Sequence, residues 1–256
     1  MQLPDSAILH NLHVPGLTRP DTVFEKRYIE CRIREQRVYN DEQVNRLPDC
    51  TSSHPHYGEW QLRKRSADKL LRYLSAKKTS LQVLEIGCGN GWLSHQLSQL
   101  PGTRVTGLDV NFTELQQAAR VFNNCRGLKF VYGNIDSGIP AGKQYDIILF
   151  AASLQYFRSV GGILDDCLQH LAPGGEIHII DTNFYPRKEL VAARERTRSY
   201  YASLNMPEMA EHYFHHTIEA LAQFDHRVLY DPASWRNRFS RNRLPFHWIM
   251  ITKDSA

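Results

Sequence analysis

Three alternate glycines within nine residues are the feature of this sequence with the clearest chemical meaning. The segment reads VLEIGCGNG over residues 83–91, so apolar residues lead directly into Gly87, Gly89 and Gly91. Glycine permits a tight turn and lets a ligand approach the backbone without a Cβ in the way. A helix is expected immediately after the loop, and its N-terminus offers free N–H groups and the positive end of a helix dipole. The segment therefore predicts a ligand site at a strand-to-helix turn.

An acidic residue at the end of the next predicted strand strengthens this interpretation. Asp109 stands in GLDV over residues 107–110, and a carboxylate there can accept hydrogen bonds from both hydroxyls of a ribose. The loop reads GxGxG, whereas a nicotinamide dinucleotide site would favour GxGxxG, and Glu85 precedes the first glycine by two positions. The spacing thus makes an oxidoreductase the weakest of the alternatives.

Short apolar segments alternate with helical patterns through the middle of the chain. Strands are expected at 81–86, 104–109, 128–132, 146–150 and 176–181, with helices at about 60–77, 92–100, 112–124 and 157–171. This alternation predicts βαβ units and a Rossmann-like, doubly wound, mostly parallel sheet of seven strands. The last two strands, near 226–230 and 246–252, are expected to form an antiparallel pair.

The rest of the chain is predicted to decorate this single domain. Residues 1–57 form an N-terminal extension or lid, with helices at 22–38 and 41–47, and residues 58–256 form the domain itself. A helical insert at about 182–224 follows the fifth strand, with helices expected at about 187–204 and 212–223.

Composition limits the class of protein. Hydrophobic residues make up 42% and charged residues 23% of 256 residues, which excludes a disordered, fibrous or coiled-coil chain. The longest apolar run, residues 147–152, falls far short of the ~20 residues that a membrane span needs. No secretory signal is evident. Five cysteines without a CxxC pair argue against a disulfide framework or zinc ribbon, so we expect a cytoplasmic protein.

Taken together, these segments resemble the class I S-adenosylmethionine-dependent methyltransferases over roughly residues 58–181. EIGCGNG at 85–91 matches the family's glycine loop around the methionine part of the cofactor, and Asp109 matches its ribose-binding acid. GNID at 133–136 falls where the family lays a polar side chain and a backbone N–H against adenine. Asn134 replaces the usual Asp there, yet still offers an acceptor and a donor. Residues 145–150 and 171–175 are similar to the fourth strand and to the turn before the fifth.

The resemblance implies a cofactor, S-adenosylmethionine, with S-adenosylhomocysteine as its product, and a set of residues around it. These cofactor-binding candidates are Glu85, Gly87, Cys88, Gly89, Gly91, Asp109, Val110, Asn134, Ile135 and Ala151. Fold analogy adds Tyr28, closing over the cofactor from the extension, and Arg63, which with Arg65 meets the cofactor carboxylate or an acidic acceptor. We interpret Cys88 as a small packing residue, because methyl transfer needs no covalent nucleophile.

The acceptor side is expected where polar and aromatic residues gather, at 54–60, 153–157 and 212–216. A histidine with a pKa near neutral is a natural base for an oxygen or nitrogen acceptor, so His56, Tyr57 and His216 are the catalytic candidates. Gln155, Tyr156 and Tyr213 are the acceptor-binding candidates. His212 and His216 share a helix face at i, i+4, but no zinc signature surrounds them, so no metal is expected.

The predicted function is transfer of a methyl group from S-adenosylmethionine to an oxygen or nitrogen atom of a small molecule. An RNA or protein methyltransferase is the first alternative. Against nucleic acid stand AASL at 151–154, where amino-group enzymes on nucleic acids carry Asn-Pro-Pro-Tyr, and a net charge of only +4. A non-catalytic cofactor-binding scaffold or regulatory protein is the alternative of another class. We expect no membrane partner and a monomer or homodimer.

Overall fold

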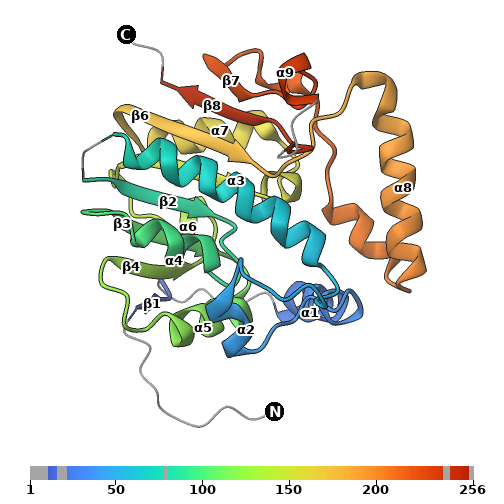
Figure 1. The fold of residues 1–256 in the computed structure, drawn as a ribbon, viewed down its shortest axis with the longest axis horizontal. Helices are drawn as coiled ribbons and strands as arrows, with labels where there is room; N and C mark the ends of the chain where they lie inside the picture. The colour runs from blue at the N-terminus through green and yellow to red at the C-terminus, as the bar shows by residue number, and fades with distance from the viewer. Residues whose placement is uncertain (1–10, 16–21, 78–79, 239–242, 254–256) are drawn as a thin grey trace.

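A sheet of eight strands runs through the part of the chain that the computed structural model describes, residues 11–15, 22–77, 80–238 and 243–253. Its order is β1-β4-β3-β2-β5-β6-β8-β7 (Figure 1). The strands are β1 (Leu12–His13), β2 (Gln82–Ile86), β3 (Arg104–Asp109), β4 (Leu128–Tyr132), β5 (Tyr145–Ala151), β6 (Leu171–Ile180), β7 (His226–Tyr230) and β8 (Trp248–Thr252). All neighbours pair in parallel except β6 with β8 and β7 with β8, which pair antiparallel.

The strand order reverses beside β2, and this sets the place of the site. The chain builds β3 and β4 on one side of β2 and then crosses to β5 on its other side. In open parallel sheets, ligands bind outside the carboxyl ends of the strands at such a reversal. The fold therefore directs attention to the loops that follow β2, β3, β4 and β5.

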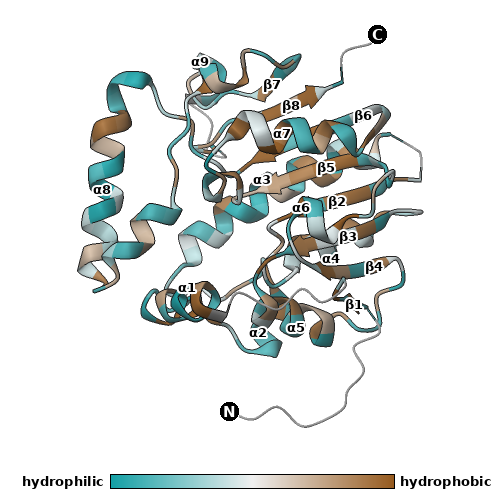
Figure 2. Ribbon diagram, turned by 180° about the vertical axis from the view of Figure 1, so that it is seen from behind, coloured by the Kyte–Doolittle hydropathy of each residue, from teal (hydrophilic) through white to brown (hydrophobic). Residues whose placement is uncertain are grey.

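Helices cover both faces of the sheet. One face carries α3 (Tyr57–Ser75), α4 (Trp92–Ser98) and α5 (Phe112–Val121), and the other carries α6 (Ile135–Gly138) and α7 (Val160–Gln169) (Figures 1 and 2). Successive strand residues point to opposite faces, so Ile147 joins the first core and Ile148 the second. Both are almost fully buried, which confirms the doubly wound sheet that the continuous apolar run predicts.

The sheet has one strand more than the sequence predicts. The addition is the edge strand β1, whose Leu12 and His13 pair with Phe130 and Val131 of β4. Two paired residues leave no periodic pattern in the sequence, so only the tertiary pairing defines this strand.

The extension is helical, as predicted, with α1 (Thr22–Arg34) and α2 (Asp41–Arg46). Helix α1 ends earlier than residue 38, and Gln36 just beyond it has a left-handed φ of 57°. Asn40 caps α2, because its side chain accepts a hydrogen bond from the backbone of Gln43 at 2.9 Å.

The insert after β6 differs from expectation in its second half. Helix α8 (Leu190–Ser203) lies within the predicted 187–204, preceded by the short 3₁₀ turn η2 (Arg187–Glu189). The helix predicted at 212–223 is wrong: the chain forms only the 3₁₀ turns η3 (Pro207–His212) and η4 (Ile218–Leu221). Between them His216 forms a β-bridge with Phe184, and its carbonyl accepts from Tyr185 N at 2.8 Å. These extended pairings replace the hydrogen bonds that a helix would make.

The extension and the insert meet beyond the carboxyl edge of the sheet. Cys31 of α1 is buried with Tyr201 of α8 and with Met206 and Met209 near η3. Figure 1 shows α1 and α8 lying together on this side. Segments about 170 residues apart in sequence thus cover the edge that carries the site, as the bond from Arg34 to the carbonyl of Asn205 illustrates. Among the described residues, no helix has the length and apolarity needed to cross a membrane.

Candidate functional site

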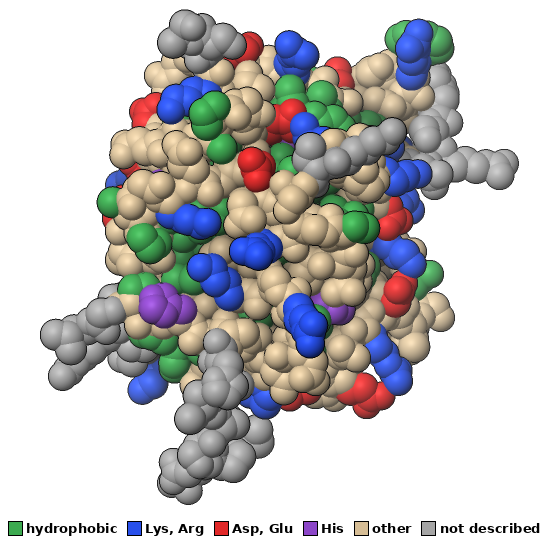
Figure 3. All heavy atoms as spheres, turned by 90° about the vertical axis from the view of Figure 1, so that its left-hand side faces the viewer, with side chains coloured by type: hydrophobic (Ala, Val, Ile, Leu, Met, Phe, Trp, Pro, Cys, Tyr) green, Lys and Arg blue, Asp and Glu red, His purple; other side chains and the backbone are tan. Residues whose placement is uncertain are grey.

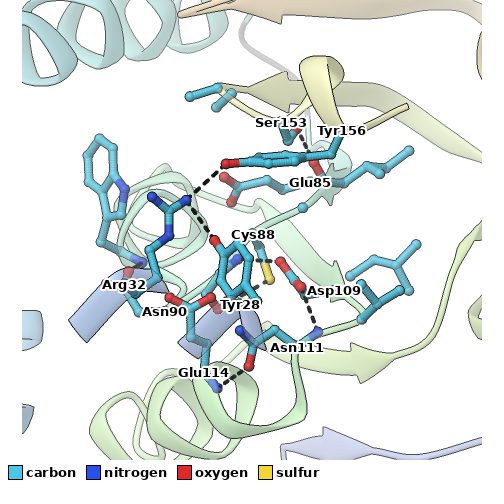
Figure 4. Close-up of a pocket in the computed structure, with 18 of the residues that line it drawn as sticks. Tyr28, Arg32, Glu85, Cys88, Asn90, Asp109, Asn111, Glu114, Ser153 and Tyr156 are labelled. Carbon is cyan, nitrogen blue, oxygen red and sulfur yellow. Dashed lines mark hydrogen bonds between the residues drawn. The ribbon is translucent and has the colours of Figure 1, made fainter. Parts of the chain in front are cut away.

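A pocket of about 370 Å³ opens at the carboxyl ends of the central strands. Its floor comes from the loops after β2, β3, β4 and the 3₁₀ turn η1 (Leu154–Tyr156) region after β5, and its cover comes from α1 and α3. Figure 4 shows side chains of the floor, such as Asp109, and of the cover, such as Arg32, pointing into the same space. The pocket has the size of a small-molecule site.

The glycine loop after β2 is held by packing on two sides. Gly87 has φ 75°, and a Cβ there would lie 2.5 Å from Cβ of Ser153. Gly91 has the same φ, and a Cβ would lie 2.6 Å from the ring of Phe130. Both positions therefore require glycine for conformation and for space. The loop backbone is thus fixed as a floor on which a ligand can rest.

Asp109, the last residue of β3, holds this loop and faces the pocket. Its Oδ2 accepts from Gly89 N at 2.7 Å, and its Oδ1 accepts from Asn111 N at 2.8 Å. Burial raises the pKa of Asp109, although these backbone N–H groups act in the opposite direction. Each oxygen retains acceptor capacity, which suits a pair of vicinal hydroxyl groups.

Two further carboxyl groups, those of Glu85 and Glu114, line the same pocket. Glu85 is 3% exposed, and its Oε2 accepts from Ser94 Oγ at 2.5 Å. Burial, with a contribution from the charge of Asp109, raises the pKa of Glu85 to about 8. The same two causes raise the pKa of Glu114, in the first turn of α5, to about 7. A bound cation would favour the ionised form of both groups.

Guanidinium groups line the opposite side of the pocket. Arg37 and Arg63 share Glu59, with Nη2 of Arg37 2.6 Å from Oε2 and Nη2 of Arg63 2.9 Å from Oε1. Burial alone would raise the pKa of Glu59, but the two guanidinium groups outweigh it and hold that pKa at about 2. Arg32 of α1 donates from Nη2 to the phenol oxygens of Tyr28 and Tyr156, at 2.8 and 2.9 Å (Figure 4).

The structure brings together nearly all of the cofactor-binding candidates. Those that line the pocket are Tyr28, Arg63, Glu85, Gly87, Cys88, Gly89, Asp109, Val110, Asn134, Ile135 and Ala151. Gly91 lies beneath the loop instead, as the residue before α4. Asn134 caps α6, since its Oδ1 accepts from Ser137 N at 2.9 Å. Its amide nitrogen is the group left for a ligand.

The catalytic candidates lie elsewhere. His56 binds the carbonyl oxygen of Glu35 through Nε2 at 2.7 Å, and Tyr57 is 38% exposed at the start of α3. His216 is 7% exposed, and its Nε2 lies 3.2 Å from the carbonyl oxygen of Leu154. None of the three lines the pocket, so the geometry gives no support to a base at these positions.

Of the three acceptor-binding candidates, one lines the pocket and two do not. Tyr156 lines the pocket, and the ring of Tyr213 packs edge-on against it at 6.0 Å, one layer away. Gln155 turns back, with Nε2 2.5 Å from the carbonyl oxygen of Ala152. Of these residues, only Tyr156 reaches the pocket directly.

Sequence reasoning missed several lining residues. They are Phe24, Arg32, Arg37, Trp60, Asn90, Glu114 and His212. A signal existed for Arg32, which lies one helical turn after Tyr28 and therefore on the same face of α1. Trp60 and His212 lie in the polar and aromatic segments 54–60 and 212–216 expected on the acceptor side, although neither is one of the predicted site residues.

The strand order, the glycine turn after β2 and the acidic residue ending β3 define a Rossmann-like nucleotide-binding protein. A family model described as a methyltransferase domain matches residues 83–175. Together with the strand order and the glycine loop, this match supports a class I S-adenosylmethionine-dependent methyltransferase domain in this part of the chain.

Known relatives cover part of the chain. A malonyl-[acyl-carrier protein] O-methyltransferase of Ilyobacter polytropus is 30% identical over 123 residues, 47% of this chain and 47% of that protein. A ubiquinone biosynthesis O-methyltransferase of Salmonella arizonae is 29% identical over 141 residues, 53% of this chain and 57% of that protein. The chain thus matches about half the length of the curated relatives.

Solved structures extend the similarity of fold. The plantazolicin methyltransferase BpumL in complex with S-adenosylhomocysteine covers 90% of this chain and 96% of its own, with a TM-score of 0.54 and 18% identity. At this identity the likeness establishes the fold and not the acceptor.

Proposed function

We propose that the protein transfers a methyl group from S-adenosylmethionine to an oxygen or nitrogen atom of a small molecule. The observation that carries the proposal is the pocket at the reversal of strand order, where the glycine loop, Asp109 and Glu85 converge. The match of residues 83–175 to the methyltransferase domain model and the O-methyltransferase names of the relatives support the same reaction.

The donor groups in the pocket fit this cofactor. Asp109 offers acceptors for the ribose hydroxyls, and the Glu85 carboxyl group suits a cationic amino group. Arg63, paired with Glu59 at the pocket wall, suits the cofactor carboxylate. The glycine backbone leaves room for the methionine part, and Asn134 and Ile135 are the proposed adenine contacts.

When bound, S-adenosylmethionine supplies a methyl group that is already electrophilic. The work left to the chain is to hold the acceptor in line and to exclude water. Helix α1 supports the second task, because Tyr28 and Arg32 cover the pocket. Among the described lining residues His212 is the one histidine, and its ring packs at 4.8 Å against Phe24. Positioning is therefore proposed to outweigh proton abstraction, and His56, Tyr57 and His216 remain predictions.

We further propose the division of the chain into an extension, residues 1–57, and a domain, residues 58–256. The contacts of α1 with the pocket support a lid role for the first half of the extension. Residues around α2 belong to the domain core instead, because Val44 is fully buried and Leu47 is 4% exposed.

A small acceptor is favoured over RNA or protein. The extension and the insert cover the carboxyl edge of the sheet, which leaves a pocket rather than a broad surface. Figure 3 shows the side opposite the pocket, where lysine and arginine side chains lie among acidic ones, the pattern of an ordinary solvated surface. A cytoplasmic location and a monomer or homodimer complete the proposal.

Calorimetric titration tests the function and separates it from the alternatives. We expect S-adenosylmethionine and S-adenosylhomocysteine to bind with micromolar affinity, and NADH, the control, not to bind. Absence of binding by both sulfur compounds would refute the proposal. Binding without formation of S-adenosylhomocysteine from any mixture of metabolites would favour the non-catalytic scaffold.

A further inference from the structure

Arg32 has an unusual set of partners at the pocket cover. Its Nη1 lies 2.8 Å from Oε2 of Glu35, so one side of the guanidinium group has an anionic partner. Its Nη2 donates to two neutral groups, the phenol oxygens of Tyr28 and Tyr156. Arg37 and Arg63 differ, because both form ion pairs with Glu59. The Nη2 side of Arg32 is thus a cationic group that faces neutral hydroxyls.

Tyr28 and Tyr156 can each still donate a hydrogen bond from the hydroxyl proton. Each phenol oxygen accepts from Arg32, and among the described residues neither hydroxyl has an acceptor for its own proton. Burial raises the pKa of Tyr28 well above its ordinary value, so this phenol stays protonated and remains a donor. Both hydroxyl groups therefore lie within hydrogen-bond distance of the same guanidinium nitrogen. A carboxylate, which only accepts, matches this set of donors.

The nearby acids do not neutralise this side of Arg32. The charge of Glu114 raises the pKa of Arg32, and the charge of Arg32 lowers the pKa of Asp109. Among the described residues, however, neither acid lies within 4.0 Å of Arg32 as an ion pair. The oxygens of Asp109 accept from the backbone of the glycine loop and of Asn111. Burial raises the pKa of Glu114 to about 7, which leaves much of this group neutral near pH 7.

The position of the three groups relates them to the acceptor. Tyr156 lies in η1, directly after β5, and Tyr28 and Arg32 reach it from α1 (Figure 4). Arg63, which the proposed function assigns to the cofactor carboxylate, lies on α3. A molecule that enters between α1 and η1 meets Arg32 and the two phenols.

We propose that the methyl acceptor is a carboxylic acid whose carboxylate is bound by Arg32 together with the hydroxyls of Tyr28 and Tyr156. The inference rests on the proposed function, and it makes Arg32 the residue that determines the class of acceptor. When the carboxylate binds, Nη2 of Arg32 gives up its contacts with the phenol oxygens and gains charged hydrogen bonds to the carboxylate, which replace them.

Titration of the S-adenosylhomocysteine complex with two matched pairs of probes tests the inference. The acids are malonate and benzoate, and the neutral partners are malonamide and benzamide. We expect at least one acid to bind about tenfold more tightly than its amide, a preference that Arg32→Met removes. Arg32→Lys should retain part of the preference. Arg27→Met, an exposed arginine on the same helix, is the matched control and should leave it unchanged.

Binding of the cofactor product separates the possible failures. If wild-type protein binds no S-adenosylhomocysteine, the proposed function fails before the acceptor is tested. If the complex forms but prefers neither acid to its amide, the inference is overturned. It is also overturned if Arg32→Met weakens S-adenosylhomocysteine tenfold while 5′-methylthioadenosine, which lacks the amino-acid part, binds as before. That result would assign Arg32 to the cofactor carboxylate. Circular dichroism of each variant confirms that the fold is intact.

Discussion

At the scale of single residues, Asp109 both holds the glycine loop and offers acceptors to a ligand. Asp109→Asn keeps the size but places an amide near the N–H groups of Gly89 and Asn111. It also removes a charged acceptor for the ribose, so S-adenosylhomocysteine should bind about ten- to a hundredfold more weakly, roughly 1.5–3 kcal/mol. Calorimetry measures the change. Asp136→Asn, an exposed aspartate near the pocket, is the control, and equal affinity in both variants would remove Asp109 from the site.

The raised pKa of Glu85 predicts that a proton is released when the cofactor binds. Its pKa of about 8 lies above its ordinary 4.5, so the group contributes stability that is present below pH 4.5 and is lost as pH rises through 8. At pH 7 it is therefore largely protonated, and a cationic ligand lowers its pKa. Binding of S-adenosylmethionine should release a fraction of a proton, which calorimetry in buffers of different ionisation enthalpy detects. Glu85→Gln should abolish most of this release. An unchanged release would mean that another group, such as Glu114, supplies the proton.

At the scale of elements, the turn from β2 into α4 depends on packing as well as on backbone conformation. Gly91→Ala would place a Cβ 2.6 Å from the ring of Phe130 and 3.0 Å from Cβ of Ala118. Gly142→Ala is a matched control, because Gly142 has the same φ of 75° with nothing within 4 Å. We expect Gly91→Ala to cost about 1–3 kcal/mol more free energy of unfolding than the control. Urea denaturation measures both, and equal losses would show that φ alone accounts for the glycine.

The elements also show how far the sequence predicts this molecule. The strands and the glycine loop are local patterns, so residues 83–91 and Asp109 reveal a site whose parts meet at one sheet edge. The cover follows different rules. Arg32 meets Tyr156 across 124 positions, and no periodicity links them. His216 reads as helical by spacing, yet its backbone pairs with Phe184. Non-local pairing therefore decides the acceptor side, while local sequence decides the cofactor side.

At the scale of the whole molecule, the extension has two physically different halves. Helix α1 packs on the insert through Cys31 and covers the pocket through Tyr28. The segment that follows belongs to the main core: Tyr39 is 8% exposed, and the Nε1 of Trp60 donates to its hydroxyl at 3.2 Å. Val44 and Leu47 lie in the same cluster of buried residues. Within the extension, we therefore expect the part that acts as a lid to end between α1 and Tyr39, and the residues that follow, up to residue 57, to pack as part of the main core.

Two truncations test this division. Deleting residues 1–34 removes α1 and β1 but keeps Tyr39, Val44 and Leu47, so the sheet should still fold while the pocket loses its cover. Deleting residues 1–50 also removes these three buried side chains, each worth about 1.5–3 kcal/mol. The longer deletion should therefore lower the Tm by about 10–35 °C relative to the shorter one. Differential scanning calorimetry compares the two, and both lack β1, so that strand cancels. Equal Tm values would place residues 35–50 with the lid. If the shorter protein binds S-adenosylhomocysteine as tightly as the full chain, α1 covers the acceptor alone.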